Sequence, residues 1–281
     1  ISIITKIVPD HQNWYGNMVT YVDDKKLIYK DQDKGCYSIF DNGFDEDGTG
    51  PENSSTWGEE FSSESNATVL RYGKEKFKYG KFGVYQDIDE NGSWCGKVIL
   101  PNMEKPETIL KDLSVPGSHM KTNVLNAALV LYLMNVPKEK IIEMLGKWNG
   151  IEHRLQFFHE YKTDNSVFKF YNDSCATVPE AVIAACESFD EKPILLTGGT
   201  DKGLSADNLI SFLSKSQEEK PFRDIYFLSG TFTDKITPSL KESGIEYNGP
   251  FDSLDSLLEK LKTDTKSFNE NKIIPVVFSP K

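Results

Sequence analysis

The sequence predicts an α/β protein of two domains, with a Rossmann-like, doubly wound sheet in the second. A chain of 281 residues has room for two domains of ordinary size. After Gly150, apolar strand-like runs alternate regularly with helical segments, which is typical of a mainly parallel sheet. We therefore place one domain at residues 1–150 and the other at 151–281.

The first domain shows strands and helices in a less regular order. In chain order we expect a strand over 1–8, a helix from Asn17, a surface excursion over 41–66, hairpins over 67–100, a helix from Lys121 to Met134 and a helix from Pro137. The turn Asn149-Gly150 ends this domain.

The second domain follows a β-α-β order. We expect strands over 167–171, 193–197, 224–229, 245–247 and 273–278, and helices over 177–186, 206–216, 234–243 and 253–262. Thr177-Val178-Pro179-Glu180 fits a capping box followed by a first-turn proline, so Thr177 is the expected cap.

Charge and cysteine usage exclude several classes of protein. The net charge of −11 gives no basic footprint for nucleic acid, and no apolar run is long enough to span a bilayer. The four cysteines show no CxxC pair, which is typical of reduced thiols. We expect a cytoplasmic protein that binds no nucleic acid, inserts in no membrane and is a monomer.

The helix from Asn17 carries a lysine on its apolar stripe. Lys25 lies at i+7 from Met18, whereas Lys26 points about 100° away. A buried lysine is costly unless it is paired or modified. Lys25 either extends its ammonium to Asp10 or Asp24, or is carbamylated to give an anionic oxygen ligand for Mg²⁺.

Two polar segments come directly after strands of the second domain. Asn172-Asp173-Ser174 follows one strand, and Gly198–Gly203, which contains Lys202, follows the next. The carboxyl ends of parallel strands are where α/β sheets place ligands. Each segment is also compatible with an ordinary loop. Neither is a Walker A loop, and the chain contains no GxxxxGK[ST] sequence.

Three further positions carry a similar ambiguity. His11 follows a strand and is either a metal ligand or a solvated loop residue. Arg154 suits nucleotide phosphates or a surface salt bridge with Glu152. Asn123 lies in a helix that opens after Pro116-Gly117 and is either a base contact or part of an ordinary helix start.

Taken together, these segments resemble the ATP-dependent Mur ligases, and the form Asn172-Asp173-Ser174-Cys175-Ala176-Thr177 resembles their D-glutamate-adding branch. The resemblance covers essentially the whole chain. It implies that residues 1–150 are the second part of the central ATP- and metal-binding domain, and that residues 151–281 are the amino-acid-binding domain. The family's P-loop and UDP-binding domain would then precede Ile1, and the chain alone would not turn over.

The resemblance also implies roles for individual residues. His11 and carbamylated Lys25 would hold Mg²⁺ or Mn²⁺ and, with Arg154, serve catalysis. Asn123, Arg154 and Asp173 would bind ATP. The remaining matched residues would bind the substrates, D-glutamate and UDP-N-acetylmuramoyl-L-alanine: Thr177, Lys202 and Ser174.

Some positions depart from the family pattern. Met120 replaces an asparagine beside the adenine contact, and Cys175 replaces a lysine; Lys6, Asn13 and Val178 are further departures. Two other interpretations remain open. One is another Mur or folylpolyglutamate-type ligase, and the other is a non-catalytic α/β binding module that lacks a P-loop.

Overall fold

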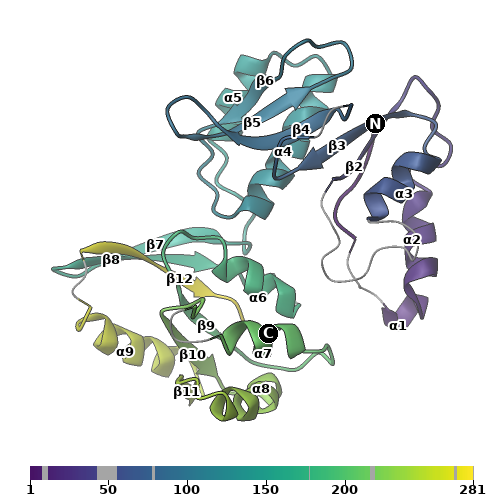
Figure 1. Ribbon diagram of the computed structural model, residues 1–281. Coiled ribbons are helices and arrows are strands. Elements are labelled where there is room, and N and C mark those ends of the chain that lie inside the picture. Colours follow the sequence, from purple (N-terminus) through teal and green to yellow (C-terminus); the bar gives the residue numbers. More distant parts are fainter. Residues whose placement is uncertain are drawn as a thin grey trace. The chain divides into compact units, whose positions relative to one another are not determined.

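The computed structural model describes residues 1–7, 12–42, 56–77, 80–176, 178–215, 219–268 and 271–280. It divides into two compact units. Unit 1 comprises residues 1–114 and 120–148, and unit 2 comprises residues 115–119 and 149–281. Each unit is built on one six-stranded sheet (Figure 1).

Unit 1 has a mixed sheet in the order β1-β2-β3-β4-β5-β6, parallel from β1 to β4 and antiparallel from β4 to β6. Its strands are β1 (Ser2–Ile4), β2 (Tyr37–Asp41), β3 (Thr68–Gly73), β4 (Gly83–Ile88), β5 (Trp94–Ile99) and β6 (Glu107–Lys111). Its helices are α1 (Gln12–Tyr15), α2 (Met18–Lys26), α3 (Trp57–Glu64), α4 (Ser118–Leu133) and α5 (Lys138–Gly146), of which α4 begins in unit 2.

Aromatic side chains hold α2 and α3 against the first strands of this sheet. Tyr21, Tyr29, Phe40 and Phe61 are all buried in one cluster, and the rings of Phe40 and Phe61 lie 5.6 Å apart. Rings at this separation add packing energy to the burial of their apolar area. Helix α2 begins where expected, because the Asn17 side chain accepts a hydrogen bond from the Thr20 N–H group at 2.9 Å.

Unit 2 has a sheet in the order β11-β10-β9-β12-β8-β7, in which only the pair β7–β8 is antiparallel. Its strands are β7 (Gln156–Lys162), β8 (Ser166–Asn172), β9 (Ile194–Gly198), β10 (Asp224–Leu228), β11 (Asn248–Phe251) and β12 (Lys272–Phe278). Its helices are α6 (Pro179–Cys186), α7 (Asp207–Leu213), α8 (Thr231–Glu242) and α9 (Leu254–Thr265).

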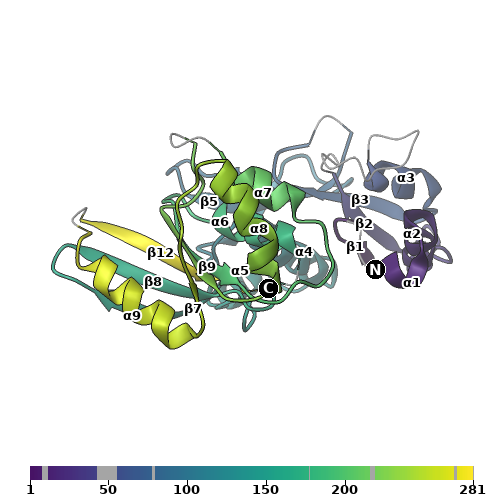
Figure 2. The same ribbon diagram turned by 90° about the horizontal axis from the view of Figure 1, so that it is seen from below.

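Helices cover both faces of the unit 2 sheet. One face packs Leu195 and Phe227 against α6, α7 and α8, and the other packs Ile194 and Tyr226 against α9. Alternate residues of one strand point to opposite faces, so both faces of β9 and β10 are apolar. Figures 1 and 2 show α9 well separated from the other three helices. The predicted doubly wound second domain is confirmed.

Four local predictions were wrong. Hairpins were expected over 67–100, but β3 and β4 pair in parallel, and the antiparallel pair in that stretch is β4–β5. The expected surface excursion contains helix α3, whose Trp57 and Phe61 are buried. The short strand expected at 245–247 lies instead at β11, where Asn248 pairs with Tyr226. The N-cap of α6 is Val178, which makes no side-chain cap bond, with Pro179 in the first turn. Thr177 itself lies outside the described residues.

Candidate functional site

Three neighbouring strands of unit 2 end in polar segments at the same edge of the sheet. Strand β12 lies between β9 and β8, and all three run parallel. Asp173 and Ser174 follow β8, Lys202 lies in the loop after β9, and Ser279 follows β12. The strand order reverses here. The chain runs from β8 through β9 and β10 to β11 in one direction across the sheet, and β12 is then inserted between β9 and β8. Open α/β sheets bind ligands at such a point.

The segment at the end of β8 is a tight turn held by its own side-chain and backbone hydrogen bonds. The Asn172 carboxamide oxygen accepts a hydrogen bond from the Ser174 N–H group at 3.0 Å, and the Ala176 N–H group donates to the Asp173 carbonyl at 2.9 Å. This Asx turn leaves the Ser174 side chain exposed at the edge of the sheet. A substrate group could therefore reach it.

Asp173 is buried, although the sequence predicted an acid that accepts hydrogen bonds from ATP. Its exposed fraction is 6%. One carboxylate oxygen accepts from the Leu155 N–H group at 3.1 Å, and the other accepts from the Ser279 hydroxyl at 3.0 Å. The carboxylate is thus engaged with the protein itself.

Arg154 is exposed and directly precedes Leu155, whose N–H group is bonded to this carboxylate. Its N–H group donates to the Ile151 carbonyl at 3.1 Å. The alternative salt bridge with Glu152 does not occur among the described residues. An exposed guanidinium at the edge of the sheet is well suited to bind an anion.

The loop that carries Lys202 is anchored to the start of α8. The Asp201 N–H group donates to the Thr231 hydroxyl at 2.9 Å, and the Asp201 carboxylate pairs with Lys235 at 3.0 Å. The hydrogen bond from Lys235 holds the pKa of Asp201 below its usual value. Gly198 opens the loop with a φ of +102°, and a Cβ there would lie 2.4 Å from the Leu228 carbonyl oxygen. The loop is thereby fixed while the Lys202 side chain is exposed.

In unit 1 the two neighbouring lysines have the opposite environments from those predicted. Lys25 is exposed and its ammonium lies 5.2 Å from the centre of the Tyr21 ring, so it is not buried on the apolar stripe. Helix α2 ends one residue later, at Lys26. The Lys26 ammonium instead pairs with Glu60 at 2.5 Å and Glu64 at 2.9 Å. Burial opposes the charge of Lys26, but these hydrogen bonds outweigh it and raise its pKa.

The other predicted residues of unit 1 are only partly placed. Asn123 is exposed on α4, whereas Met120 is buried. His11 lies outside the described residues. Within the described part of the chain, no group of three or more His, Cys, Asp or Glu side chains could hold a metal ion. In the same part, no helix is long and apolar enough to cross a membrane.

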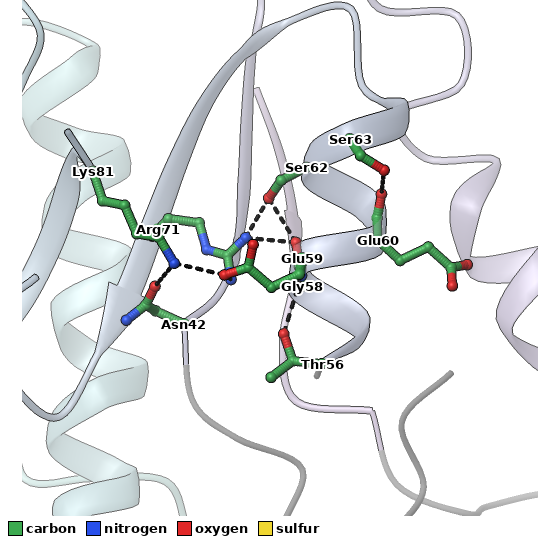
Figure 3. A network of polar contacts seen from close by, with 9 residues as sticks. All are labelled: Asn42, Thr56, Gly58, Glu59, Glu60, Ser62, Ser63, Arg71 and Lys81. Atoms are coloured by element: carbon green, nitrogen blue, oxygen red, sulfur yellow. Dashed lines mark hydrogen bonds and ion pairs between the residues drawn. The ribbon is translucent and has the colours of Figure 1, made fainter. Parts of the chain in front are cut away.

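A polar network lies at the ends of β2 and β3 in unit 1 (Figure 3). Arg71 is 3% exposed and donates to the Gly58 carbonyl at 2.5 Å and to the Ser62 hydroxyl. Its guanidinium is 3.6 Å from Glu59, which also pairs with Lys81 at 2.6 Å. Burial lowers the pKa of Arg71, and Glu59 and Asp41 partly offset that effect. This network fastens α3 to the sheet.

The sequence did not single out Ser279 as part of the site. Ser279 is fully buried, its N–H group donates to the Leu196 carbonyl at 2.9 Å, and its carbonyl accepts from the Thr197 hydroxyl at 2.7 Å. Its place directly after a strand was the signal that could have drawn attention to it.

Curated relatives match the chain along its length. The chain is 30% identical, over all of its length, to the UDP-N-acetylmuramoylalanine–D-glutamate ligase of Treponema pallidum (strain Nichols), of which it covers 57%. It is also 30% identical, over 92% of its length, to the ligase of the same name from Staphylococcus aureus (strain MSSA476), of which it covers 50%. The chain therefore spans about half the length of these relatives. No protein-family model matches the sequence.

Solved structures of Mur ligases share the fold. The match to MurF from Acinetobacter baumannii has a TM-score of 0.65 at 15% identity and covers 99% of this chain and 56% of that one. UDP-N-acetylmuramate-alanine ligase MurC from Thermotoga maritima matches with a TM-score of 0.59 at 20% identity, over 99% of this chain and 55% of that one. MurF from Thermotoga maritima in complex with ADP matches with a TM-score of 0.59 at 15% identity, over 99% of this chain and 58% of that one. These comparisons confirm the predicted resemblance and fold class.

Proposed function

The chain is homologous, along its whole length, to part of the Mur ligases, and on that basis we propose that it belongs to an ATP-dependent ligase that joins D-glutamate to UDP-N-acetylmuramoyl-L-alanine. The product would be a precursor of peptidoglycan. ADP in the related MurF structure supports a nucleotide site in this fold.

One observation in the structure carries this proposal. Asp173, in the segment that resembles the D-glutamate-adding branch, and Lys202, in a segment that resembles the Mur ligases, both follow parallel strands of one sheet, at the edge where its strand order reverses. Chemistry in open α/β sheets is placed at this position. The exposed side chains of Arg154, Ser174 and Lys202 belong to the same unit and are available to substrates.

The reaction would proceed through an acyl phosphate. The terminal carboxylate of UDP-N-acetylmuramoyl-L-alanine takes the γ-phosphoryl group of ATP, the amine of D-glutamate attacks the carbonyl carbon, and phosphate leaves as the amide forms. In this scheme Arg154 neutralises charge on the phosphates, and Lys202 and Thr177 bind the carboxylates of D-glutamate. Asn123 contacts adenine. The protein contributes position and charge neutralisation rather than a covalent intermediate.

The described residues do not by themselves form a divalent-cation site. The Lys25 ammonium is a cation and cannot ligate a metal without modification, and His11 is not described. A bound Mg²⁺ or Mn²⁺ would neutralise phosphate charge in a reaction of this kind. That His11 and carbamylated Lys25 hold the ion remains part of the proposal, and no step here depends on it. The exposure of Lys25 leaves its amine accessible to carbon dioxide.

The test is an assay of the complete protein for phosphate release from ATP in the presence of UDP-N-acetylmuramoyl-L-alanine. Release should require D-glutamate. Lys202→Ala should raise the KM for D-glutamate by about tenfold or more, because it removes a charged partner of a carboxylate. Lys266→Ala is the matched control, since it removes another exposed lysine, which lies just after α9.

Other results would favour the other interpretations. Phosphate release that depends on a different amino acid would indicate another ligase of the same superfamily. Nucleotide binding without any substrate-dependent release would indicate a non-catalytic module. An unchanged KM in Lys202→Ala would remove the assigned role of Lys202 alone.

A further inference from the structure

We infer that Asp173 and the previously unassigned Ser279 are positioning residues, which hold the turn around Arg154 in the geometry that binds nucleotide phosphates. This inference rests on the proposed function for its ligand, because it takes Arg154 to be the phosphate contact. It gives Asp173 a role other than the direct contact with ATP that the sequence predicted. The residues concerned all belong to unit 2.

The backbone around Arg154 adopts conformations that are uncommon for its residues. His153 has a φ of +63° and Leu155 a φ of +42°. Positive φ is rare in residues other than glycine, and it is strained for a bulky residue such as leucine. Such a turn persists only where surrounding contacts hold it. The aim of the Arg154 side chain therefore depends on those contacts.

The last residue of β8 and the segment after it supply three of these contacts. The Leu155 N–H group donates to the Asp173 carboxylate at 3.1 Å, and the Cys175 N–H group donates to the His153 carbonyl at 3.0 Å. The Asn172 carboxamide nitrogen lies 2.9 Å from Nδ1 of His153. The residues before and after Arg154 are thus both bonded to one turn of the sheet edge.

The end of β12 supplies the second support. The Ser279 hydroxyl donates to the other oxygen of Asp173 at 3.0 Å, and the Asp173 N–H group donates to the Phe278 carbonyl at 2.8 Å. Ser279 is itself held by the end of β9, through the Thr197 hydroxyl at 2.7 Å. Asp173 therefore joins the Arg154 turn to the sheet edge at β12, whose end is in turn joined to β9.

Burial supports a positioning role over direct contact with substrate. Ser279 has no exposed surface and Asp173 only 6%. The Leu155 side chain is also buried, in a cluster with Ala185 and Val277. Arg154 alone in this group presents a charged side chain to solvent. A change at Ser279 should therefore alter ligand binding only through Arg154.

The experiment is a double-mutant cycle in the complete protein, with the affinity for ADP as the measurement. Arg154→Ala should weaken ADP binding by about tenfold or more, and Ser279→Ala by about fivefold, in line with the loss of charged and neutral hydrogen bonds. In the Arg154→Ala background, Ser279→Ala should cost less than about twofold, because the side chain through which it acts is gone. Ser166→Ala is the control, since that serine is 4% exposed at the start of β8 and its hydroxyl has no partner among the described residues.

A conservative replacement separates position from charge at Asp173. Asp173→Asn can still accept a hydrogen bond from the Leu155 N–H group, so it should keep the affinity for ADP within about threefold of the parent. Asp173→Ala should lose at least as much affinity for ADP as Ser279→Ala does. This pair also keeps the inference testable if Ser279→Ala does not fold.

The outcomes distinguish the inference from the proposed function. If Arg154→Ala binds ADP as well as the parent, the phosphate role and the inference are both overturned. If Arg154→Ala weakens binding but Ser279→Ala weakens it equally in both backgrounds, the positioning inference is overturned and the proposed function stands. Equal losses in Asp173→Asn and Asp173→Ala would also overturn the inference, because the charge itself would then be required.

Discussion

Lys25 and Lys26 are adjacent in sequence, but we expect their replacement by alanine to affect different properties of the protein, namely turnover and stability. Lys25 is exposed and carries the proposed carbamate, whereas Lys26 is paired with Glu60 and Glu64. Lys25→Ala should abolish turnover with little loss of stability. Lys26→Ala should lower stability and leave turnover largely intact.

The contacts of each lysine set the expected magnitudes. The exposed fractions of the Lys26, Glu60 and Glu64 side chains are 19%, 25% and 43%, so both ion pairs are partly screened by water. Together they should contribute about 1–2 kcal/mol, which Lys26→Ala would lose. Lys25 contacts the Tyr21 ring at 5.2 Å, and an exposed cation–π contact contributes about 0.5–1 kcal/mol at most. The raised pKa of Lys26 means that its contribution is fully present at neutral pH and is lost only as pH rises through the folded-state value.

The assays are thermal unfolding and D-glutamate-dependent phosphate release from ATP, both on the complete protein. Lys26→Ala should unfold about 2–8 °C lower than the parent. Lys25→Ala should lose turnover by about 100-fold or more, because metal neutralisation of phosphate charge is worth several kcal/mol. Full activity in Lys25→Ala would refute the proposed carbamate. Loss of turnover in Lys26→Ala without loss of stability, with Lys25→Ala active, would show that the two roles had been exchanged.

Three further predictions follow from the described contacts. The hydrogen bond from Lys81 keeps the pKa of Glu59 below its usual value. Glu59 therefore stabilises the fold above its unfolded-state pKa, and this contribution is lost as pH falls through its folded-state pKa. Glu59→Gln should lose less thermal stability than the parent between pH 7 and pH 3. Gly230→Ala would place a Cβ 2.1 Å from a carbonyl oxygen of the loop after β9. The variant should therefore unfold at a lower temperature than the parent and have a higher KM for D-glutamate. An unchanged unfolding temperature and an unchanged KM would contradict this prediction. Burial raises the pKa of Cys186 to about 12, so iodoacetamide at pH 8 should label exposed Cys175 in the folded protein and leave Cys186 unmodified, as peptide mass mapping would show.

Strong periodic patterns made most of unit 2 predictable. Apolar runs such as β9 and β12 are buried on both faces, so their sequences are almost wholly apolar and easily recognised. Strand β7 was not predicted, because four consecutive residues in it are exposed at the edge of the sheet and no alternation appears. Helix α3 was not predicted either, because glycine and serines weaken its helical signal and packing of Trp57 and Phe61 holds it.

The sequence alone determined the fold class of unit 2, the placement of Asp173 and Lys202 after strands, and the resemblance to the Mur ligases. These follow from local patterns: strand period, turn residues and the spacing of short motifs. Only the tertiary structure decided that Lys25 is exposed while Lys26 is paired, and that Asp173 is buried against Ser279, which lies 106 residues further along the chain. The burial and the hydrogen-bond partners of a residue depend on which segments, distant in sequence, are in contact, and a local sequence pattern does not specify those contacts.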